Sequence, residues 1–286
     1  MWWRGNGCKA PRVPVTGRRC GRGGVVQADE AHLVLRLARG PRDLAAAQRL
    51  RYRVFVTELG GDGPLVDHPN RLERDAFDPI FDHLILVDTR IDPASLDDVI
   101  GVYRLLPWDR LPPGGDYYSA GEYDLAPLIA SRRRLLELGR SCVHPAHRGG
   151  TAMFHLWNGL ADYVQARDIE VLFGVASFHG TDLSRLAQPL SWLHHHHLAP
   201  PDLRVAARGP GRAGMDLLPP EALDRKAAML ATPALIKAYL RLGGFVGEGA
   251  FVDRAFNTTD VCLVMDTARM SDRHRAFYMR SHGALA

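Results

Sequence analysis

The segment Leu135–Met153, LLELGRSCVHPAHRGGTAM, constrains the fold more than any other part of the chain. A short apolar stretch typical of a strand carries Glu137 and Arg140, and the glycine-rich turn Arg148–Gly150 then leads into a helical pattern. A strand followed by a turn whose backbone N–H groups point outward at a helix start forms an anion site. The segment therefore predicts a strand–turn–helix unit that could hold a phosphate group, with an acid and a base on the preceding strand.

Length and composition predict an ordinary globular protein. The chain has 286 residues, of which 46% are hydrophobic and 24% charged, enough for one large core. No apolar run approaches the roughly 18 residues that are needed to span a bilayer. The four cysteines show neither CxxC spacing nor a disulfide-rich framework. We therefore expect a cytoplasmic protein in which Cys142 is a small buried strand residue, with a catalytic thiol as the alternative.

The first 24 residues carry six Lys and Arg side chains and no acid, although the net charge of the whole chain is only +4. Because this segment is rich in Gly and Pro and shows no periodicity, we predict a disordered basic leader over residues 1–30. It lacks the apolar segment of a secretory signal. The segment is either a solvated tail, or a stretch included because the start codon is assigned too far upstream, or a contact site for anionic lipid or an acidic protein. In the lipid case Trp2 and Trp3 would help, and the protein would lie peripherally at the inner membrane.

The spacing of apolar residues predicts alternating strands and helices. Strands are expected over 32–37, 83–88, 99–106, 135–143 and 171–176. Helices are expected over 44–55, with Asp43 as a candidate N-cap, and over 151–167. The stretch 171–176 is apolar throughout, as expected of a strand inside a sheet. This order predicts an α/β protein with a mixed central sheet and helices on both faces.

The chain is expected to have a core over 31–190 and a C-terminal part over 191–270 that completes the sheet and the pocket. Within that part, a short helix is expected over 233–242, and strands over 244–253 and 260–266 are expected to pair. A tail follows over 271–286.

Four short motifs occur in order across about 90 residues, and no single one is specific. They are Arg51-x-x-Val54-Phe55, Glu73-x-Asp75-x-x-Asp78, Arg104-Leu105-Leu106-Pro107 and Glu137-x-x-Arg140. As a set they resemble two branches of the GCN5-related N-acyltransferase (GNAT) superfamily. These are the acyl-homoserine-lactone synthases and the hemolysin-like L-ornithine Nα-acyltransferases. The later segments SWLHHHHLAPPDLRV, PALIKAYLRLGG and FNTTDVCLVM resemble the second branch.

The resemblance implies a GNAT fold with a C-terminal extension. It implies transfer of a 3-hydroxyacyl group from acyl carrier protein to the α-amine of L-ornithine, which gives lyso-ornithine lipid, the first step of ornithine-lipid biosynthesis. No cofactor is implied beyond the phosphopantetheine of the donor. Two alternatives stay open: a lactone-synthase-like acyltransferase, and a non-catalytic hemolysin-like protein that binds lipid.

The reaction requires a group that takes a proton from the attacking amine, which is mostly protonated near neutral pH. Glu137, on the strand beside the expected thioester, is our candidate, and Arg140 is assigned to the catalytic site with it. The alternative is a structural ion pair of Glu137 with Arg140 or Arg104. A strand arginine would otherwise meet the carboxylate of the substrate, because an unpaired buried arginine is costly.

Asp75 and Asp78 suit the side-chain ammonium of a diamino acid, or they pair structurally with Arg51, Arg53 or Arg104. By the resemblance, the acceptor-binding residues are Arg51, Asp75, Asp78, Arg104 and Asn257.

The donor-binding residues expected around the glycine turn are Val143, Arg148, Gly149, Gly150 and Thr151. The usual superfamily turn has small residues where this chain has Thr151 and Met153. This weakens the cradle for the pyrophosphate of coenzyme A and favours the single phosphate of a carrier protein. The basic run Arg132–Arg134 is either a docking surface for that acidic protein or a solvated loop.

The run His194–His197 does not predict a metal site, and its residues either help to shape the acyl or amine pocket or serve as helix surface and packing. Adjacent histidines cannot all face one ion from a regular helix, and neither paired cysteines nor an HExxH motif accompanies them. Nucleic-acid-binding motifs do not occur in the globular part.

Overall fold

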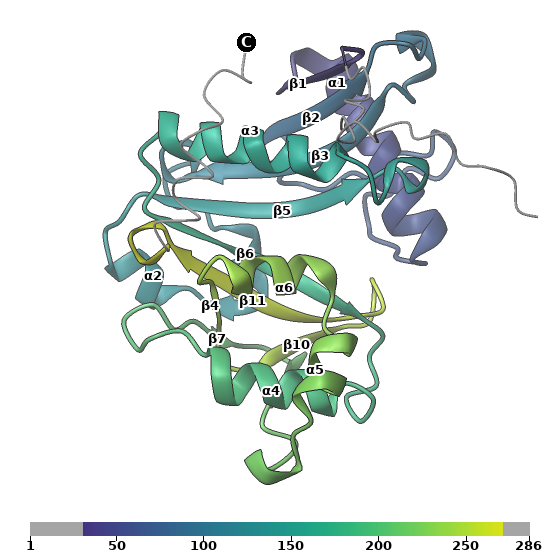
Figure 1. Ribbon diagram of the computed structural model, residues 1–286. Coiled ribbons are helices and arrows are strands. Elements are labelled where there is room, and N and C mark those ends of the chain that lie inside the picture. Colours follow the sequence, from purple (N-terminus) through teal and green to yellow (C-terminus); the bar gives the residue numbers. More distant parts are fainter. Residues whose placement is uncertain (1–30, 271–286) are drawn as a thin grey trace, which may run out of the picture. The chain divides into compact units, whose positions relative to one another are not determined.

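The computed structural model describes residues 31–270, in which a nine-stranded mixed sheet is the main feature (Figure 1). The strands follow the order β1-β2-β3-β5-β6-β11-β10-β8, and β9 also pairs with β11. Their bounds are β1 Leu33–Leu37, β2 Asp82–Asp88, β3 Val99–Pro107, β5 Leu135–Val143, β6 Val171–His179, β8 Arg212–Ala213, β9 Phe245–Val246, β10 Ala250–Asp253 and β11 Thr258–Asp266. A separate two-stranded sheet pairs β4 (Tyr123–Asp124) with β7 (Ala206–Ala207).

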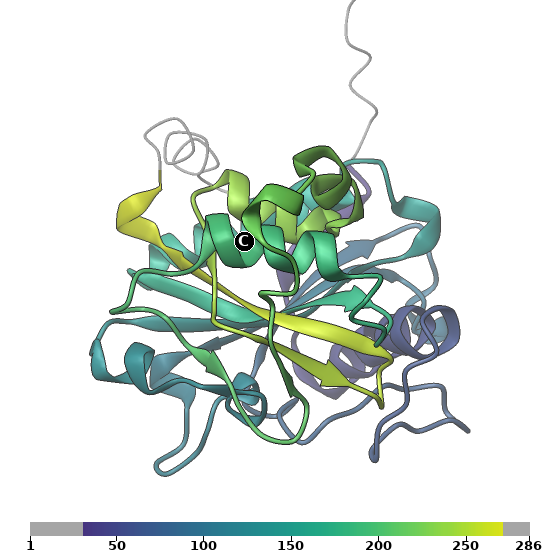
Figure 2. The same ribbon diagram turned by 90° about the horizontal axis from the view of Figure 1, so that it is seen from below.

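Helices cover both faces of the large sheet (Figures 1 and 2). One face is covered by α3 (Ala152–Ala166), α4 (Ala187–His197) and α6 (Ala234–Arg241), and α5 (Arg225–Ala231) packs against α4. The other face is covered by α1 (Gly40–Arg51), which continues into a π-helical segment, Tyr52–Glu58, and by the region around α2 (Ala126–Ala130). Short 3-10 turns lie at 93–95, 108–110, 118–121, 145–147, 220–222 and 267–269.

The apolar alternation of the strands explains these layers. On β11, Leu263 and Met265 pack with α3 and α6, whereas Cys262 and Val264 pack on the opposite face. A strand turns successive side chains to opposite faces, so a strand that is apolar throughout requires cover on both. The predicted α/β class, a mixed sheet flanked by helices, is confirmed.

Most predicted elements appear within one or two residues of their expected bounds, with three differences. The first helix begins at Gly40 rather than after Asp43. Pro41 is tolerated in the first turn, because the backbone N–H that proline lacks would have no hydrogen-bond partner inside the helix at that position. Asp43 still accepts a hydrogen bond from the N–H of Arg39, at 2.7 Å. The predicted strand 171–176 extends to residue 179, and the predicted strand 244–253 is divided into β9 and β10.

Neither terminal segment is described. The predicted disordered leader over residues 1–30 and the tail over 271–286 lie outside the described residues. Across residues 31–270, no helix combines the length and the apolarity that crossing a bilayer requires.

The feature of the fold that positions the site is a gap between β5 and β6. These neighbours are parallel, and their ladder has three residue pairs, the last of which is Glu137 with Phe173. Beyond this pair the strands diverge. At the point of divergence, a Cβ atom on Gly174 would lie 2.1 Å from the carbonyl oxygen of Leu138, so only glycine allows the two backbones to approach so closely.

Candidate active site

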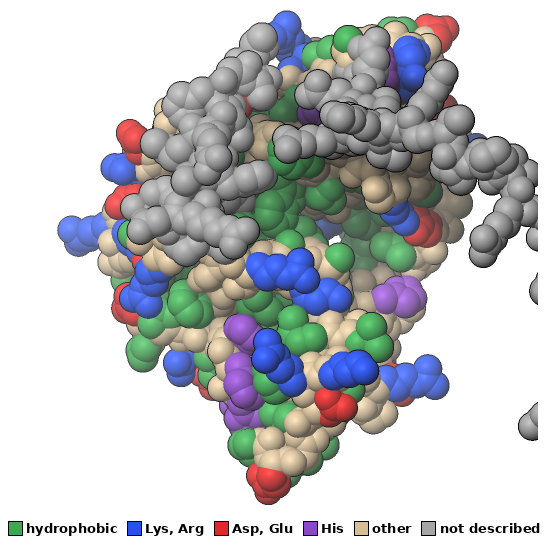
Figure 3. Space-filling view, viewed as in Figure 1, with side chains coloured by type: hydrophobic (Ala, Val, Ile, Leu, Met, Phe, Trp, Pro, Cys, Tyr) green, Lys and Arg blue, Asp and Glu red, His purple; other side chains and the backbone are tan. Residues whose placement is uncertain are grey.

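A cavity of about 250 Å³ lies in the gap between β5 and β6 and opens toward both faces of the sheet. On the α3 and α6 face its wall is mainly apolar, and we call this side the apolar arm. Its residues are Tyr103, Leu138, Leu172, Leu235, Tyr239, Leu263 and Met265. The space-filling view shows a hollow lined by hydrophobic side chains between β5 and α6 (Figure 3).

On the opposite face the wall is polar and aromatic, and we call this side the polar arm. Its residues are Phe55, Tyr118, Arg140, Ser177, Asp253, Phe256, Thr258 and Asp260. A single cavity therefore joins an apolar surface and an acidic surface through the sheet. An apolar chain and a charged small molecule can meet in such a cavity at the gap.

Three of the predicted acceptor-binding residues belong to a buried ion-pair cluster beneath the polar arm. Arg51 and Arg104 are fully buried, and both contact Asp78, at 2.6 and 3.0 Å. Arg51 also pairs with Glu73. Burial opposes ionisation of Asp78, but the two guanidinium groups hold the pKa of this carboxyl below its usual value. Asp78 is therefore an anion fixed between arginines.

Asp75 lies at the edge of the same cluster. It pairs with Arg104 and lies 3.5 Å from Arg140, and it retains slight exposure. Despite burial, Arg104 and Arg140 hold the pKa of Asp75 below its usual value. The predicted structural pairing is thus present for both aspartates. Their second predicted role, binding the ammonium of the acceptor, stays a prediction.

Arg140 is the member of the cluster that reaches the cavity. Its backbone φ is +49°, unusual for a residue other than glycine, and marks an irregular position in β5. The guanidinium contacts Glu73 at 3.2 Å and lies over the rings of Tyr118 and Phe256, 4.9 and 5.1 Å from their centroids. It therefore offers a positive charge to a ligand in the polar arm.

Glu137 is held by a turn rather than by an arginine. It is fully buried, and its two carboxylate oxygens accept hydrogen bonds from the backbone N–H groups of Tyr118 and Ser119, at 2.9 and 2.6 Å. Burial raises the pKa of Glu137 above its usual value, although the hydrogen bonds oppose this. Glu137 is not among the residues that line the cavity. Its role as proton acceptor stays a prediction, and the geometry shows that it positions Tyr118.

A second group of acids, not identified from the sequence, lies at the polar arm. Glu122, Asp253 and Asp260 bring one oxygen each within 4.8 Å of the others. Burial, together with repulsion among the three carboxyls, raises the pKa of Glu122 to about 8 and that of Asp260 to about 6. We call these three residues the acidic triad.

The predicted donor-binding residues gather where β5 ends and α3 begins. Arg148 pairs with Glu58 at 2.6 Å and donates a hydrogen bond to the carbonyl oxygen of Val143, at 3.2 Å. Gly149 has a φ of +78°, and Gly150 and Thr151 lead into α3. None of these five residues lines the cavity. They form a neighbouring surface, and their contact with the donor stays a prediction.

Asn257 and Cys142 also have defined places. Asn257 lies in the turn between β10 and β11 with a φ of +52°, and its carbonyl oxygen accepts a hydrogen bond from the N–H of Gly180. Its neighbours Phe256 and Thr258 line the cavity, whereas Asn257 does not. Cys142 is buried against α1, and burial raises the pKa of its thiol to about 12, which fits the predicted structural role.

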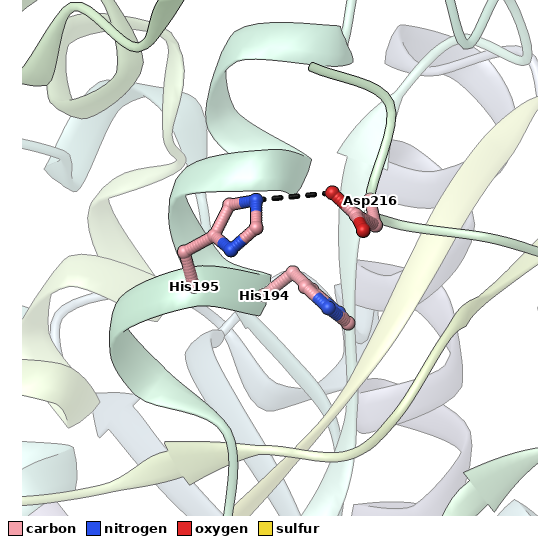
Figure 4. Close-up of side chains that lie close together, drawn as sticks. All are labelled: His194, His195 and Asp216. Carbon is pink, nitrogen blue, oxygen red and sulfur yellow. Dashed lines mark ion pairs between the residues drawn. The ribbon is translucent and has the colours of Figure 1, made fainter. Parts of the chain in front are cut away.

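The histidine run His194–His197 lies on α4 and is not part of the cavity wall (Figure 4). His195 points to Asp216, with 3.0 Å between Nε2 and Oδ1. His194 completes a group whose possible ligand atoms lie within 4.8 Å of one another. Two adjacent histidines thus approach one acid, while His196 stacks on Trp192 instead.

Comparison with known proteins agrees with the fold and shows the family of the chain. The family described as acetyltransferase (GNAT) domain matches residues 50–158. A protein of Rhodobacter capsulatus named L-ornithine N(alpha)-acyltransferase is 66% identical over 246 residues, which cover 86% of this chain and 94% of that protein. A protein of Brucella abortus with the same name is 41% identical, covering 86% of this chain and 88% of its own.

Among solved structures, a CoA-dependent acyl-homoserine lactone synthase with MTA superposes with a TM-score of 0.50 at 14% identity. The superposition covers 89% of this chain and 92% of that protein. At this identity the likeness concerns the fold alone.

Proposed function

The chain belongs to the family of L-ornithine Nα-acyltransferases within the GNAT superfamily, and we propose that it transfers a 3-hydroxyacyl group from acyl carrier protein to the α-amine of L-ornithine. The product would be lyso-ornithine lipid, in the first step of ornithine-lipid biosynthesis. The observation that carries the proposal is the cavity that joins the apolar arm to the polar arm, with its acids Asp253 and Asp260, at the gap between β5 and β6. It offers one site to a fatty chain and another to a cationic amino acid.

The proposed reaction is a direct attack of the amine on the thioester carbonyl in the gap. A C–N bond forms and the C–S bond breaks. The amine loses one proton, and the departing thiolate takes up one proton to leave as the thiol. Beyond the pair Glu137–Phe173 the two strands no longer pair with each other. Backbone N–H groups that face the gap are suited to stabilise the negative charge developing on the carbonyl oxygen.

The apolar arm suits the acyl chain. Its residues Leu172 and Met265 also line a second cavity of about 480 Å³ beside α3, together with Leu160, Val164 and Ile169. A long chain could extend from the gap toward that space, and each buried methylene stabilises the complex by about 0.8 kcal/mol. Arg140, in the polar arm, is our candidate for binding the carboxylate of the acceptor, because arginine matches a carboxylate in bidentate geometry.

We propose that the donor is a carrier protein, because the turn at Arg148–Thr151 provides glycines only at positions 149 and 150. Of the predicted docking run, Arg133 is paired with Asp266 at 2.6 Å, and Arg134 lies near Glu170. Arg132 is exposed and is the better position for a test.

We expect 3-hydroxyacyl carrier protein to have a kcat/KM roughly tenfold or more above that of the same acyl-coenzyme A, since charge attraction accelerates encounter. This advantage should shrink with salt, because surface charges are screened beyond about 10 Å at 0.1 M ionic strength. Arg132→Glu should reduce kcat/KM for the carrier-protein donor only. The exposed Arg225 provides the charge-matched control, Arg225→Glu. Equal values for both donors, unaffected by salt and by Arg132→Glu, would exclude recognition of the carrier protein.

A further inference from the structure

The acidic triad is a group of three carboxyl groups, of which Glu122 and Asp260 are buried and Asp253 is half-buried. Glu122 and Asp260 have relative exposures of 7% and 4%. Of their carboxylate oxygens, Oε2 of Glu122 and Oδ1 of Asp260 are buried without a hydrogen-bond partner. Among residues 31–270 no salt bridge to Lys, Arg or His involves any member of the triad. Buried polar atoms are usually hydrogen-bonded, so these two oxygens are suited to accept hydrogen bonds from a cationic ligand in the cavity.

The triad opens into the cavity where the reaction is proposed to occur. Asp253 and Asp260 both line the cavity, and one carboxylate oxygen of Glu122 lies within 4.8 Å of one oxygen of each. The rings of Tyr118 and Phe256 form part of the same wall. A ligand that places a cation in the triad would therefore pack its alkyl part against aromatic rings.

The register of the sheet sets the distance between the triad and the gap. Asp260 of β11 pairs with Ser177 of β6, three residues beyond Gly174, where the strands diverge. Three residues of strand correspond to about 10 Å. Asp260, Ser177 and Gly174 line the same cavity, so a ligand of about this length can contact the triad and the gap together.

We propose that Glu122, Asp253 and Asp260 bind the side-chain ammonium group of the acceptor and thereby select a diamino acid whose α-amine reaches the gap. The inference rests on the proposed transfer to ornithine and assigns the residues that select it. Asp75 and Asp78, which the sequence pattern predicts for this role, already pair with arginines. In the triad a primary ammonium, with three N–H donors, meets three acceptors.

The test compares ornithine with norvaline, which has the same carbon chain without the second amine. For the wild type, Asp260→Asn and Glu122→Gln, kcat/KM is measured for both amino acids with one acyl donor. We expect each variant to reduce the ratio of ornithine to norvaline by roughly tenfold or more, because a charge-assisted contact to the ammonium is lost. The value for norvaline itself should change little. Asp202→Asn and Glu221→Gln, which alter exposed acids, are the matched controls and should keep the wild-type ratio.

A second measurement does not depend on the donor. Without any donor, ornithine should raise the unfolding midpoint of the wild type more than norvaline does, since a ligand that binds only the folded state stabilises it. Asp260→Asn and Glu122→Gln should lose this difference. Both variants should themselves fold, because each amide keeps the size of the side chain and removes a carboxyl that repels its two neighbours.

Three results would overturn the inference. The first is an unchanged ratio in both variants while the wild type transfers to ornithine. The second is stabilisation of the wild type by Ca²⁺ or Mg²⁺ that Asp260→Asn abolishes without changing the ratio, which would identify a metal site. The third is an equal midpoint shift by ornithine in wild type and variants. If the wild type transferred nothing to ornithine, the proposed function would fail, and the midpoint shifts would still decide the role of the triad.

Discussion

Gly174→Ala is expected to reduce acyl transfer by roughly 10²-fold or more, since displacing reacting groups by about 1 Å has effects of that size. The added methyl group would lie 2.1 Å from the carbonyl oxygen of Leu138. The methyl carbon is bonded directly to Cα and the oxygen belongs to the backbone, so neither can move without moving a strand. The φ of +157° at Gly174 also disfavours a side chain. Strain of this kind should lower the free energy of unfolding by about 1–3 kcal/mol.

The measurement is kcat for transfer at saturating donor and acceptor, with urea unfolding of the same preparation. Gly214→Ala is the control, because nothing lies within 4 Å of a Cβ atom placed there. It should retain wild-type activity and stability. Full activity in Gly174→Ala would show that the divergence of β5 and β6 at this residue is not needed for catalysis.

Glu137→Gln should lower turnover by roughly 10²-fold, the usual contribution of a group that accepts a proton or positions a reacting side chain. Because both carboxylate oxygens accept hydrogen bonds from backbone N–H groups, the amide leaves one of these buried donors facing an NH₂ group. An unsatisfied buried donor costs about 1–3 kcal/mol, so the free energy of unfolding should fall by that amount. The turn at Tyr118, whose ring lines the cavity, should then shift.

Stability and turnover together separate two roles of Glu137. Loss of both indicates a residue that positions the turn. Loss of turnover at full stability would instead favour Glu137 as the proton acceptor that the sequence pattern predicts. Wild-type turnover in Glu137→Gln would contradict both roles. Glu221→Gln, on the exposed 3-10 turn 220–222, controls for the change from acid to amide.

The fold could be predicted largely from the sequence because its signals are local. The apolar stretch at 135–143 and the glycine turn after it define β5 and the start of α3. The sequence pattern predicts a later start for α1, because aspartate is a residue type that often caps helices and Asp43 precedes the apolar repeat. In the structure the Asp43 carboxylate pairs with Arg36 and accepts a hydrogen bond from the N–H of Arg39. Local patterns therefore identify elements better than they identify the partners of a charged side chain.

The site could be predicted only in part. The pairing of Asp75 and Asp78 with arginines follows from the motifs, since buried arginines need acids. The acidic triad could not be found in the same way. Asp253 and Asp260 meet through the pairing of β10 with β11. Glu122 lies far along the chain from both, and its neighbour Tyr123 holds it there, because the Tyr123 hydroxyl contacts the carbonyl oxygens of Gly249 and Asp260. Contacts of this kind depend on topology, which no local pattern encodes.

The central claim is that an α-amine and a thioester meet in the gap between β5 and β6 while the second amine of the acceptor is held apart. Tandem mass spectrometry of the product from ornithine and 3-hydroxyacyl carrier protein tests it most directly. The account predicts ornithine acylated on the α-nitrogen only, with the side-chain amine free. Acylation of the side-chain nitrogen, or a product formed from S-adenosylmethionine but not from ornithine, would contradict it.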